Sequence, residues 1–448
     1  MNQPKTTARR EAFQSLLRME RGKRYSNLEI DSSLKKNHLE GAEKGLYTAL
    51  VYGVTERKIS LDYLIGRLSS RPIITLDLEV LILLRIGLYQ MIWLDRIPDS
   101  AAVNESVELA KAFAPKSASF VNALLRNFLR TVDRKALPWP EKNDPDYLSV
   151  RYSCGKDVVR LLSGSLTDPE ATLSALEGQP PVTMRANTLK ISREALLEKL
   201  SEAGIAAEPT RYSPDGIRLR EKTIPGRVSE WLNDGILFIQ DEASQLAVRA
   251  ADPKPGDHLI DACACPGGKS FSAAILMQNR GEVKSFDLHK NKLSLVDAGA
   301  EKLGITILQT EEKNGAVFDA SLEETADVVL CDAPCSGLGV IAKKPEIRYK
   351  ELSETERLPS IQYAILSNVS RYVKVGGILC YSTCTLNQAE NEGVSDLFLE
   401  EHPDFSPTDF SFGELSSENG HLTLLPDKHG TDGFYIAKFR RNQKKDTI

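Results

Sequence analysis

The chain has 448 residues, which is more than one ordinary domain holds and indicates two or three domains. Hydrophobic residues make up 41% and charged residues 27%, so the composition excludes a disordered protein and is typical of a globular one. The net charge of −5 is unevenly spread, because residues 1–140 carry 22 Lys and Arg against 15 Asp and Glu, whereas the remainder carries 35 against 47. A basic first third on an acidic body indicates domains with different roles.

The N-terminal residues MNQPKTTARREAF are charged and lack the apolar core of a signal peptide, so we expect a cytoplasmic protein. The longest apolar run, Leu78–Leu94, is interrupted by Glu79, Arg85 and Gln90 and falls short of a clean membrane-spanning helix. We therefore expect a buried helix at this place and no association with a membrane.

The first part of the chain predicts helices. Over residues 6–135, apolar residues recur at helical spacing in one segment after another, and Gly or Pro separates the segments, as at Pro72, Pro98 and Pro115. This pattern predicts an all-α domain of about 130 residues. The segment PWPEKNDP that follows it is predicted to be a linker.

Residues 146–240 are predicted to form a small α+β unit. Its expected elements are strands at 182–187, 216–219 and 236–240 and a helix over 193–203.

From Asp241 onward, strands and helices are expected to alternate. The expected strands are 258–262, 282–287, 305–309, 326–331 and 377–381. This alternation predicts βαβ units and a parallel, doubly wound sheet. In such sheets ligands bind at the carboxyl ends of the strands.

One turn in this region has the features of a cofactor site. The segment HLIDACACPGGKS places Asp261 at the end of a strand, followed by a Pro-Gly-Gly turn and a helix. Gly267 and Gly268 let a ligand approach the backbone, and the helix N-terminus offers free N–H groups. A phosphate-binding loop needs glycine where Cys263 stands, so the pattern favours a nucleoside-type cofactor. Asp287, at the end of the next strand, is expected to bind ribose hydroxyls.

The cysteines are a second chemical signal. Six of the seven lie in three pairs between Cys263 and Cys384, and an odd count without a signal peptide predicts reduced thiols. Cys331 and Cys380 lie inside apolar runs and are expected in the core. Cys335 and Cys384 follow strand ends in polar turns and are candidates for chemistry. No histidine accompanies them and no C-x-x-C pair occurs, so we expect no metal site.

Taken together, these segments resemble a known family. DACACPGGKS, DAPCSGLG and YSTCTLNQAENE resemble the signatures of the S-adenosylmethionine-dependent RNA cytosine-5 methyltransferases of the NOL/NOP/Sun group, and GTDGFYIAKF is similar to its C-terminal motif. MRANTLK and FIQDEASQLAV resemble the family's small RRM-like lead-in. ALVYGVTERKISLDYLI and FVNALLRNFLR are similar to the NusB RNA-binding fold. The combination resembles the bacterial RsmB (Sun) type.

The resemblance implies a multidomain fold. We expect an all-α NusB-like domain over 1–137, a linker and an RRM-like α+β subdomain over 138–240, a Rossmann-like α/β methyltransferase domain over 241–441, and a tail over 442–448.

The resemblance also implies catalytic roles. Cytosine C5 is a poor nucleophile, and a thiolate that adds at C6 activates it. Cys384 is the implied nucleophile, and Cys335 is implied in release of the methylated product. Asp332 is the expected acid at cytosine N3, and Lys269 is expected to orient Asp332 or to lower the pKa of the thiol.

The implied cofactor is S-adenosylmethionine, lying over the turn and contacting Asp287 and Asp332. The residues of the turn are Cys263, Ala264, Cys265, Pro266, Gly267, Gly268 and Lys269. The family's third acidic cofactor contact is replaced here by Asn314, which carries no charge.

The implied partner is RNA, in the cytoplasm and with the protein as a monomer. The expected RNA contacts are Arg185, Asn187, Lys190, Lys343 and Arg348. The implied target is cytosine 967 of 16S ribosomal RNA, free or in a partly assembled small subunit. Another ribosomal or transfer RNA cytosine, or a non-catalytic NusB-like RNA-binding factor, remain as alternatives.

Overall fold

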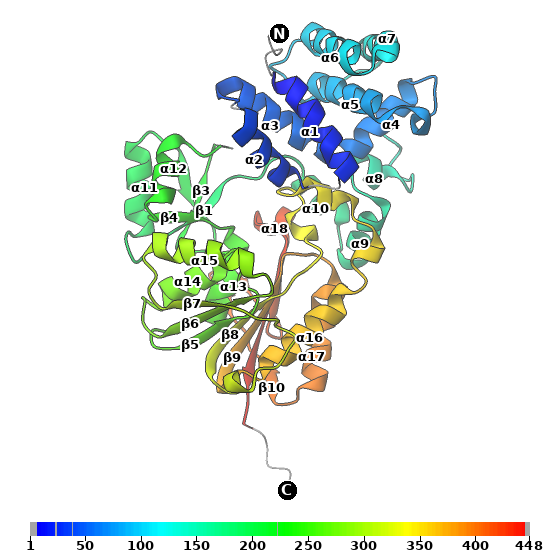
Figure 1. Ribbon diagram of the computed structural model, residues 1–448. Coiled ribbons are helices and arrows are strands. Elements are labelled where there is room, and N and C mark those ends of the chain that lie inside the picture. Colours follow the sequence, from blue (N-terminus) through cyan, green and yellow to red (C-terminus); the bar gives the residue numbers. More distant parts are fainter. Residues whose placement is uncertain (1–6, 23–24, 38, 222, 444–448) are drawn as a thin grey trace. The chain divides into compact units, whose positions relative to one another are not determined.

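The computed structural model describes residues 7–22, 25–37, 39–221 and 223–443. Most of the expected tail, at 444–448, therefore lies outside the described residues. The chain divides into two units: residues 1–161 with 341–351, and residues 162–340 with 352–448 (Figure 1). Each unit is described by itself below.

The first unit is helical, as the periodicity predicts. Its helices are α1 (Ala8–Gly22), α2 (Ser26–Asn37), α3 (Gly41–Glu56), α4 (Lys58–Leu68), α5 (Leu78–Trp93), α6 (Asp99–Phe113), α7 (Ala118–Thr131), α8 (Tyr147–Arg151) and most of α9 (Lys156–Ser165). No helix among the described residues is long and apolar enough to cross a membrane.

The apolar run at Leu78–Leu94 forms the buried central helix α5. Leu83 and Ile86 are fully buried in it. Arg85 is 4% exposed, and its guanidinium donates to both carboxylate oxygens of Asp62 at 2.7 Å and to Glu20 at 2.9 Å. These charge-assisted bonds offset the cost of burying a cation in the helix core.

The same unit contains a distant piece of sequence, the segment Ile341–Glu351. This segment, here called the strap, follows the Cys335 turn in the chain. Glu346 accepts hydrogen bonds from the amide and the hydroxyl of Ser26, at 3.1 and 2.9 Å. The Tyr349 hydroxyl donates to the Thr55 carbonyl at 2.6 Å. Sequence patterns did not indicate this excursion.

The second unit begins with a small α+β part, as expected. The antiparallel order β2-β3-β1-β4 is built from β1 (Thr183–Ala186), β2 (Ala207–Pro209), β3 (Gly216–Leu219) and β4 (Leu237–Ile239). The helices of this part are α10 (Pro169–Ala175), α11 (Arg193–Glu202) and α12 (Gly226–Asn233). Leu196, Leu200 and Trp231 pack from α11 and α12 onto the sheet.

The larger sheet has the order β10-β14-β9-β8-β5-β6-β7, with β13 paired to β14. Its strands are β5 (His258–Asp261), β6 (Glu282–Asp287), β7 (Leu308–Glu312), β8 (Ala326–Asp332), β9 (Val373–Thr383), β10 (Phe405–Pro407), β13 (His421–Leu424) and β14 (Phe434–Arg441). β5 to β9 are mutually parallel, whereas β10, β13 and β14 join antiparallel. The sheet is therefore mixed, and not parallel throughout as the sequence predicts.

Helices cover both faces of this sheet (Figure 1). They are α13 (Glu242–Ala251), α14 (Gly268–Leu276) and α15 (Lys290–Leu303) on one face and α16 (Leu358–Ser370) and α17 (Glu392–Glu401) on the other. The remaining short elements are β11 (Ser411–Phe412), β12 (Leu415–Ser416) and α18 (Pro426–His429). This double cover explains the apolar strands of the centre, which are buried on both faces.

Candidate active site at the carboxyl edge of the sheet

Four parallel strands end in polar residues at one edge of the sheet. β5 ends in Asp261, β6 in Asp287, β8 in Asp332, and β9 in Thr383, which Cys384 follows. The parallel register brings these ends together, because Asp332 pairs with Ser382 on the adjacent strand. The turns that follow the strands therefore meet where ligands bind in such sheets.

The two cysteines singled out from the sequence lie side by side. The Cys335 Sγ and Cys384 Sγ atoms are 3.2 Å apart, and both residues are partly exposed. Hydrogen bonding to Cys384 and burial together raise the pKa of the Cys335 thiol well above its usual value. The two thiols are therefore within hydrogen-bond distance, and either sulfur can be the donor. By contrast, Cys331 and Cys380 are core residues, 0% and 2% exposed, as expected.

A second pair of charged groups lies at the same edge. Lys269 Nζ donates to Asp332 Oδ2 at 2.6 Å, and the Ser382 hydroxyl donates to Asp332 Oδ1 at 2.8 Å. Burial opposes the Lys269 charge, but Asp332 outweighs it and raises the pKa of Lys269 above its ordinary value. The Lys269 ammonium also lies 5.2 Å from the centre of the Phe434 ring. Lys269 thus orients Asp332, as one of its two expected roles requires.

The cofactor turn is held by its own backbone. The Ala264 amide donates to the Phe286 carbonyl at 2.8 Å, and the Gly267 amide donates to the Ala264 carbonyl at 2.7 Å. The Cys265–Pro266 peptide bond is cis, and Gly267 has φ +109°, a conformation that other residues rarely adopt. A side chain at Gly267 would also collide with the Phe271 ring. Glycine at this position therefore allows the positive φ of the turn and avoids a collision with Phe271.

Asp261 lies beneath this turn with one oxygen in use. The Ser270 hydroxyl donates to Oδ2 at 2.6 Å, whereas Oδ1 is buried without a hydrogen-bond partner among the described residues. Burial raises the pKa of this carboxyl to about 6. A buried acceptor without a partner is costly unless a ligand supplies a donor. The turn, Asp261 and the partly exposed Asp287 together fit a nucleoside cofactor.

Two residues of the expected cofactor set are placed by local bonds. The Asp287 carboxylate accepts the His289 amide at 2.9 Å, which holds it at the end of β6. The exposed Asn314 accepts the Ala316 amide at 3.0 Å through its side chain. Asn314 lies beside Asp287, since the Lys313 amide donates to the Asp287 carbonyl at 3.0 Å.

The thiols of the cofactor turn remain protonated. Burial raises the pKa of both, and it brings the pKa of Cys265 to about 12 with a further contribution from the Asp287 charge. Neither is a nucleophile, and the turn contributes its backbone. Across the described residues, no group of three or more His, Cys, Asp and Glu side chains could hold a metal ion.

Sequence reasoning missed Glu390, which joins the two cysteine turns. It is fully buried, and Oε2 accepts the Ser336 amide at 2.8 Å and Gln362 Nε2 at 2.9 Å. Its Oε1 accepts Asn387 Nδ2 at 2.9 Å. Ser336 follows Cys335 and Asn387 follows Cys384 by three residues, so one carboxylate fixes both turns. The only signal in the sequence was an acid shortly after the second cysteine motif.

Three expected RNA contacts are buried, which corrects that part of the prediction. Arg185 and Asn187 are both 0% exposed. Arg185 donates to Asp215 at 2.9 Å, and burial lowers its pKa to about 10. Asn187 Nδ2 donates to the Gly235 and Leu303 carbonyls, each at 2.8 Å. The bond from Asn187 to Leu303 joins the small sheet to the catalytic part, and neither side chain is available to a phosphate.

Arg348 is the third correction, since it is 0% exposed inside the helical unit. It donates to the Tyr152 carbonyl at 3.0 Å and lies 3.7 Å from the Glu56 carboxylate. Lys343 is partly buried, and the exposed Lys190 donates to the Asp234 and Lys302 carbonyls at 2.9 Å each. Lys190 and Lys343 stay as predicted contacts.

Three family models match successive parts of the chain. Residues 6–130 match the NusB family, residues 167–224 match the Methyltr_RsmF/B-like, ferredoxin-like domain, and residues 248–440 match the 16S rRNA methyltransferase RsmB/F model. The order of the three matches follows the order of the helical, small α+β and catalytic parts.

Whole-chain relatives decide the family. A probable ribosomal RNA small subunit methyltransferase B of Bacillus subtilis is 38% identical, over 98% of this chain and 99% of that protein. One of Synechocystis is 34% identical, over 97% and 99%. This chain belongs to the RsmB family. The solved structure described as "Crystal Structure of PH0851" matches 98% of this chain and 100% of its own, with a TM-score of 0.79 at 26% identity.

Membership in the RsmB family establishes the class of reaction. The chain is an S-adenosylmethionine-dependent RNA methyltransferase with a NusB-like helical domain, a ferredoxin-like domain and a catalytic α/β domain. The fold expected from the sequence is confirmed, with the ferredoxin-like part in the place of the RRM-like one.

Proposed function

We propose that this RsmB family member methylates C5 of a cytosine in 16S ribosomal RNA, at position 967, through a covalent bond between Cys384 Sγ and cytosine C6. It acts in the cytoplasm as a metal-independent monomer, on free RNA or on a partly assembled small subunit. The observation that carries the proposal is the thiol pair, 3.2 Å apart, beside the Lys269–Asp332 ion pair.

The division of labour follows the three parts. Residues 1–137 bind RNA, residues 138–240 connect and contact it, and residues 241–441 hold the cofactor and the target base. The uneven charge supports this division, because the net excess of cations lies in the first 140 residues. The target base leaves its stack to reach the thiols, as enzymes that modify bases require.

Cys384 is the nucleophile of the proposed reaction. Its thiolate adds to cytosine C6, and the electron pair of the C5=C6 bond moves through the ring toward N3. The cofactor supplies the electrophilic methyl group that C5 accepts. The hydrogen bond between the thiols supports the assignment, because a high pKa keeps the proton on Cys335 and leaves the negative charge on Cys384.

Asp332 and Lys269 handle the proton at N3. Asp332 accepts two hydrogen bonds as an ionised carboxylate, from Lys269 and Ser382. A proton that passes from the Lys269 ammonium through Asp332 to N3 neutralises the charge that develops there. Asp332 outweighs the effect of burial and raises the pKa of Lys269, so Lys269 holds its proton until negative charge develops at N3.

Cys335 acts in the release of the product. Once Cys384 is bonded to C6, its hydrogen bond and its charge no longer raise the pKa of Cys335, so a larger fraction of Cys335 is the thiolate that can accept a proton. Removal of the C5 proton then returns the electron pair to C5=C6 and expels the Cys384 thiolate. The base thus becomes available at the step that needs it.

The proposal is tested with two cysteine variants and an unmodified 16S ribosomal RNA transcript. Cys384→Ala is expected to bind S-adenosylmethionine normally and to transfer no methyl group. Cys335→Ala is expected to accumulate a covalent protein–RNA species that migrates slowly on denaturing gels. Normal turnover of Cys384→Ala would contradict the nucleophile. Bisulfite sequencing of the product identifies the cytosine, and modification elsewhere would contradict the position.

A further inference from the structure

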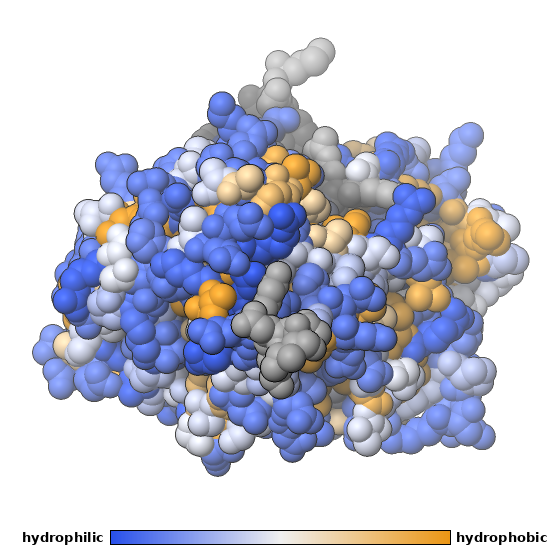
Figure 2. All heavy atoms as spheres, turned by 90° about the horizontal axis from the view of Figure 1, so that it is seen from below, coloured by the Kyte–Doolittle hydropathy of each residue, from blue (hydrophilic) through white to orange (hydrophobic). Residues whose placement is uncertain are grey.

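A second charged cavity lies at the opposite edge of the large sheet, where the parallel strands begin. Its volume is about 390 Å³, and the end of α13, the starts of β8 and β9 and the late part of β14 line it. Figure 2 shows the molecule from below the view of Figure 1, and the face that it shows is mainly hydrophilic. The charged side chains that line the cavity are Lys254, Lys374, Lys438, Arg440, Asp252, Asp257 and Asp327.

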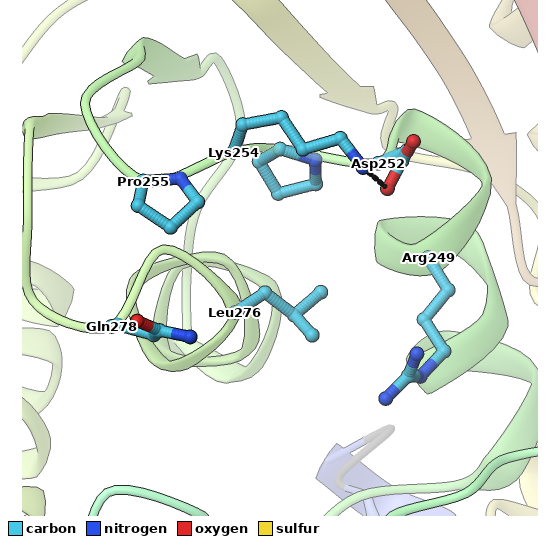
Figure 3. A pocket seen from close by; sticks show the side chains of 7 residues that line it. Arg249, Asp252, Lys254, Pro255, Leu276 and Gln278 are labelled. Carbon is cyan, nitrogen blue, oxygen red and sulfur yellow. Dashed lines mark hydrogen bonds and ion pairs between the residues drawn. The ribbon is translucent and has the colours of Figure 1, made fainter.

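Two of the four cations are neutralised by neighbours. Lys254 Nζ donates to Asp252 at 2.6 Å, and Figure 3 shows this pair at an adjacent hollow that Leu276 and Arg249 also line. Lys374 Nζ donates to Asp327 at 2.9 Å. These two pairs leave the other cations as the source of a positive potential.

Lys438 is the unusual member of the set. The residue is only 9% exposed, and its ammonium makes no hydrogen bond or ion pair with any described residue. Burial lowers the pKa of Lys438, although the nearby Asp252 opposes that shift. The stem of Lys438 is buried while its ammonium lines the cavity without a partner among the described residues, so an anion that enters the cavity can accept a hydrogen bond from it.

Arg440 stands two residues further along the same strand. Its Nη1 donates to the Gly376 carbonyl at 2.9 Å, which fixes the guanidinium at the cavity, and the residue is exposed. Residues two apart on a strand point to the same face of the sheet, so Lys438 and Arg440 line one cavity. A lysine and an arginine that converge on a cavity provide donors of the kind that bind phosphate oxygens.

The uncompensated charge of the cavity matches one monoanion. Asp257 is the remaining acid, and its Oδ2 accepts the Lys254 amide at 2.7 Å. The two ion pairs contribute no net charge. Lys438 and Arg440 carry two positive charges and Asp257 one negative charge, so the net charge of the cavity is +1. We propose that this cavity binds a single phosphate group, either a phosphodiester of the RNA or free inorganic phosphate, between Lys438 and Arg440. The proposal is independent of the methylation site and of the cysteine chemistry.

The first test titrates the full-length protein with sodium phosphate at constant ionic strength and follows the melting temperature. Phosphate also stabilises proteins by exclusion from their surface, and that part is common to all variants. Lys438→Met and Arg440→Gln are expected to lose the additional rise seen in the wild type, whereas Lys254→Met is expected to keep it. Circular dichroism checks that each variant is folded, and the exposed Arg440 is the safer of the two positions.

The second test separates the two sources of phosphate by measuring the affinity for a 16S ribosomal RNA fragment against salt. If the source is the RNA, Lys438→Met weakens binding and reduces the slope of log affinity against log salt by about one contact. If the source is free phosphate, RNA binding is unchanged while the phosphate response is lost. An equal phosphate response in the wild type, Lys438→Met and Arg440→Gln overturns the proposal and leaves Lys438 as a buried lysine facing the end of α13.

Discussion

Glu390 is the residue through which the two cysteine turns are coupled. A carboxylate with no exposed surface is costly unless every oxygen is bonded, and here both oxygens accept N–H groups from the two turns. A contact between Ser336 and Thr385, whose hydroxyls lie 2.6 Å apart, joins the turns a second time. The distance between the thiols therefore depends on a residue that touches neither of them.

We predict that Glu390→Gln lowers the rate constant of methyl transfer about 10- to 100-fold, because a hydrogen bond to a charged group contributes about 1.5–3 kcal/mol. Single-turnover kinetics measure this rate, and binding titrations are expected to show little change in affinity for S-adenosylmethionine. Glu392→Gln is the matched control, since Glu392 bonds Thr423 away from the thiols. Equal effects of the two substitutions would contradict the positioning role.

Burial of the Asp261 carboxyl lowers the stability of the folded protein at neutral pH. Burial raises its pKa to about 6, so between pH 4 and pH 6 the folded protein binds a proton that the unfolded chain has released. Stability therefore falls as the pH rises through this window, and the loss persists at neutral pH. A shift of this size corresponds to about 3 kcal/mol.

We predict that Asp261→Asn unfolds at higher urea concentration than the wild type at pH 7.5, by about 1–3 kcal/mol, and that the two differ less at pH 4. The same substitution is expected to weaken the binding of S-adenosylmethionine, because the Asn carbonyl accepts from Ser270 and the amide nitrogen at the other position cannot accept a hydrogen bond from the cofactor. Urea unfolding at the two pH values and a binding titration measure both effects. A variant that is less stable than the wild type at pH 7.5 would contradict the assigned cost.

At the scale of elements, the strap is a segment distant in the sequence that packs within the helical unit. The sequence of the strap carries lysines and an arginine and was expected to meet RNA, but Arg348 and Tyr349 turn inward. The Tyr349 hydroxyl lies within hydrogen-bond distance of the Thr55 and Glu56 carbonyls, at 2.6 and 2.9 Å. The residues that leave the Cys335 turn are therefore fixed within the helical unit.

We predict that Tyr349→Phe destabilises the helical unit by about 1–3 kcal/mol, since it leaves buried carbonyls unsatisfied. Limited proteolysis that separates the unfolding of the two units measures the change. Tyr363→Phe is the control, because the hydroxyl of Tyr363 bonds no described residue. If Tyr349→Phe leaves the proteolysis rate of the helical unit unchanged, the strap is not held through this hydroxyl.

At the scale of the whole molecule, the charge of the chain describes two different surfaces. Three exposed cations lie just before and within α7 in the helical unit: Lys116, Arg126 and Arg130. Cations that face solvent are available to RNA phosphates, whereas the buried Arg185 and Arg348 serve the fold. The net charge of the whole chain averages these surfaces and therefore predicts no partner.

We predict that replacing Lys116, Arg126 and Arg130 together by Ala weakens RNA binding and lowers the slope of log affinity against log salt by about 2, since each single-strand phosphate contact contributes about 0.7. Filter binding at several salt concentrations measures both. The control replaces three exposed cations of the catalytic unit, Lys302, Arg371 and Lys428. If the control variant loses as much RNA affinity, the assignment of RNA binding to the cations at α7 is contradicted.

The sequence by itself determined the parts of this protein that depend on local pattern. Helical periodicity marked the first domain, strand–helix alternation marked the sheet, and three short motifs marked the family, because each feature is written in neighbouring residues. The parallel strand ends then required Asp261, Asp287, Asp332 and the two cysteine turns to meet at one edge.

Only the tertiary structure decided which polar residues are free. The sequence does not distinguish a polar side chain that faces solvent from one that a distant segment covers. For this reason Arg185, Asn187 and Arg348 were predicted to contact RNA although they are buried. The antiparallel edge of the sheet, the strap and the carboxylate of Glu390 depend on contacts between segments far apart in the chain. Burial and pairing are properties of the folded chain, and they decide which of its charges can bind a ligand.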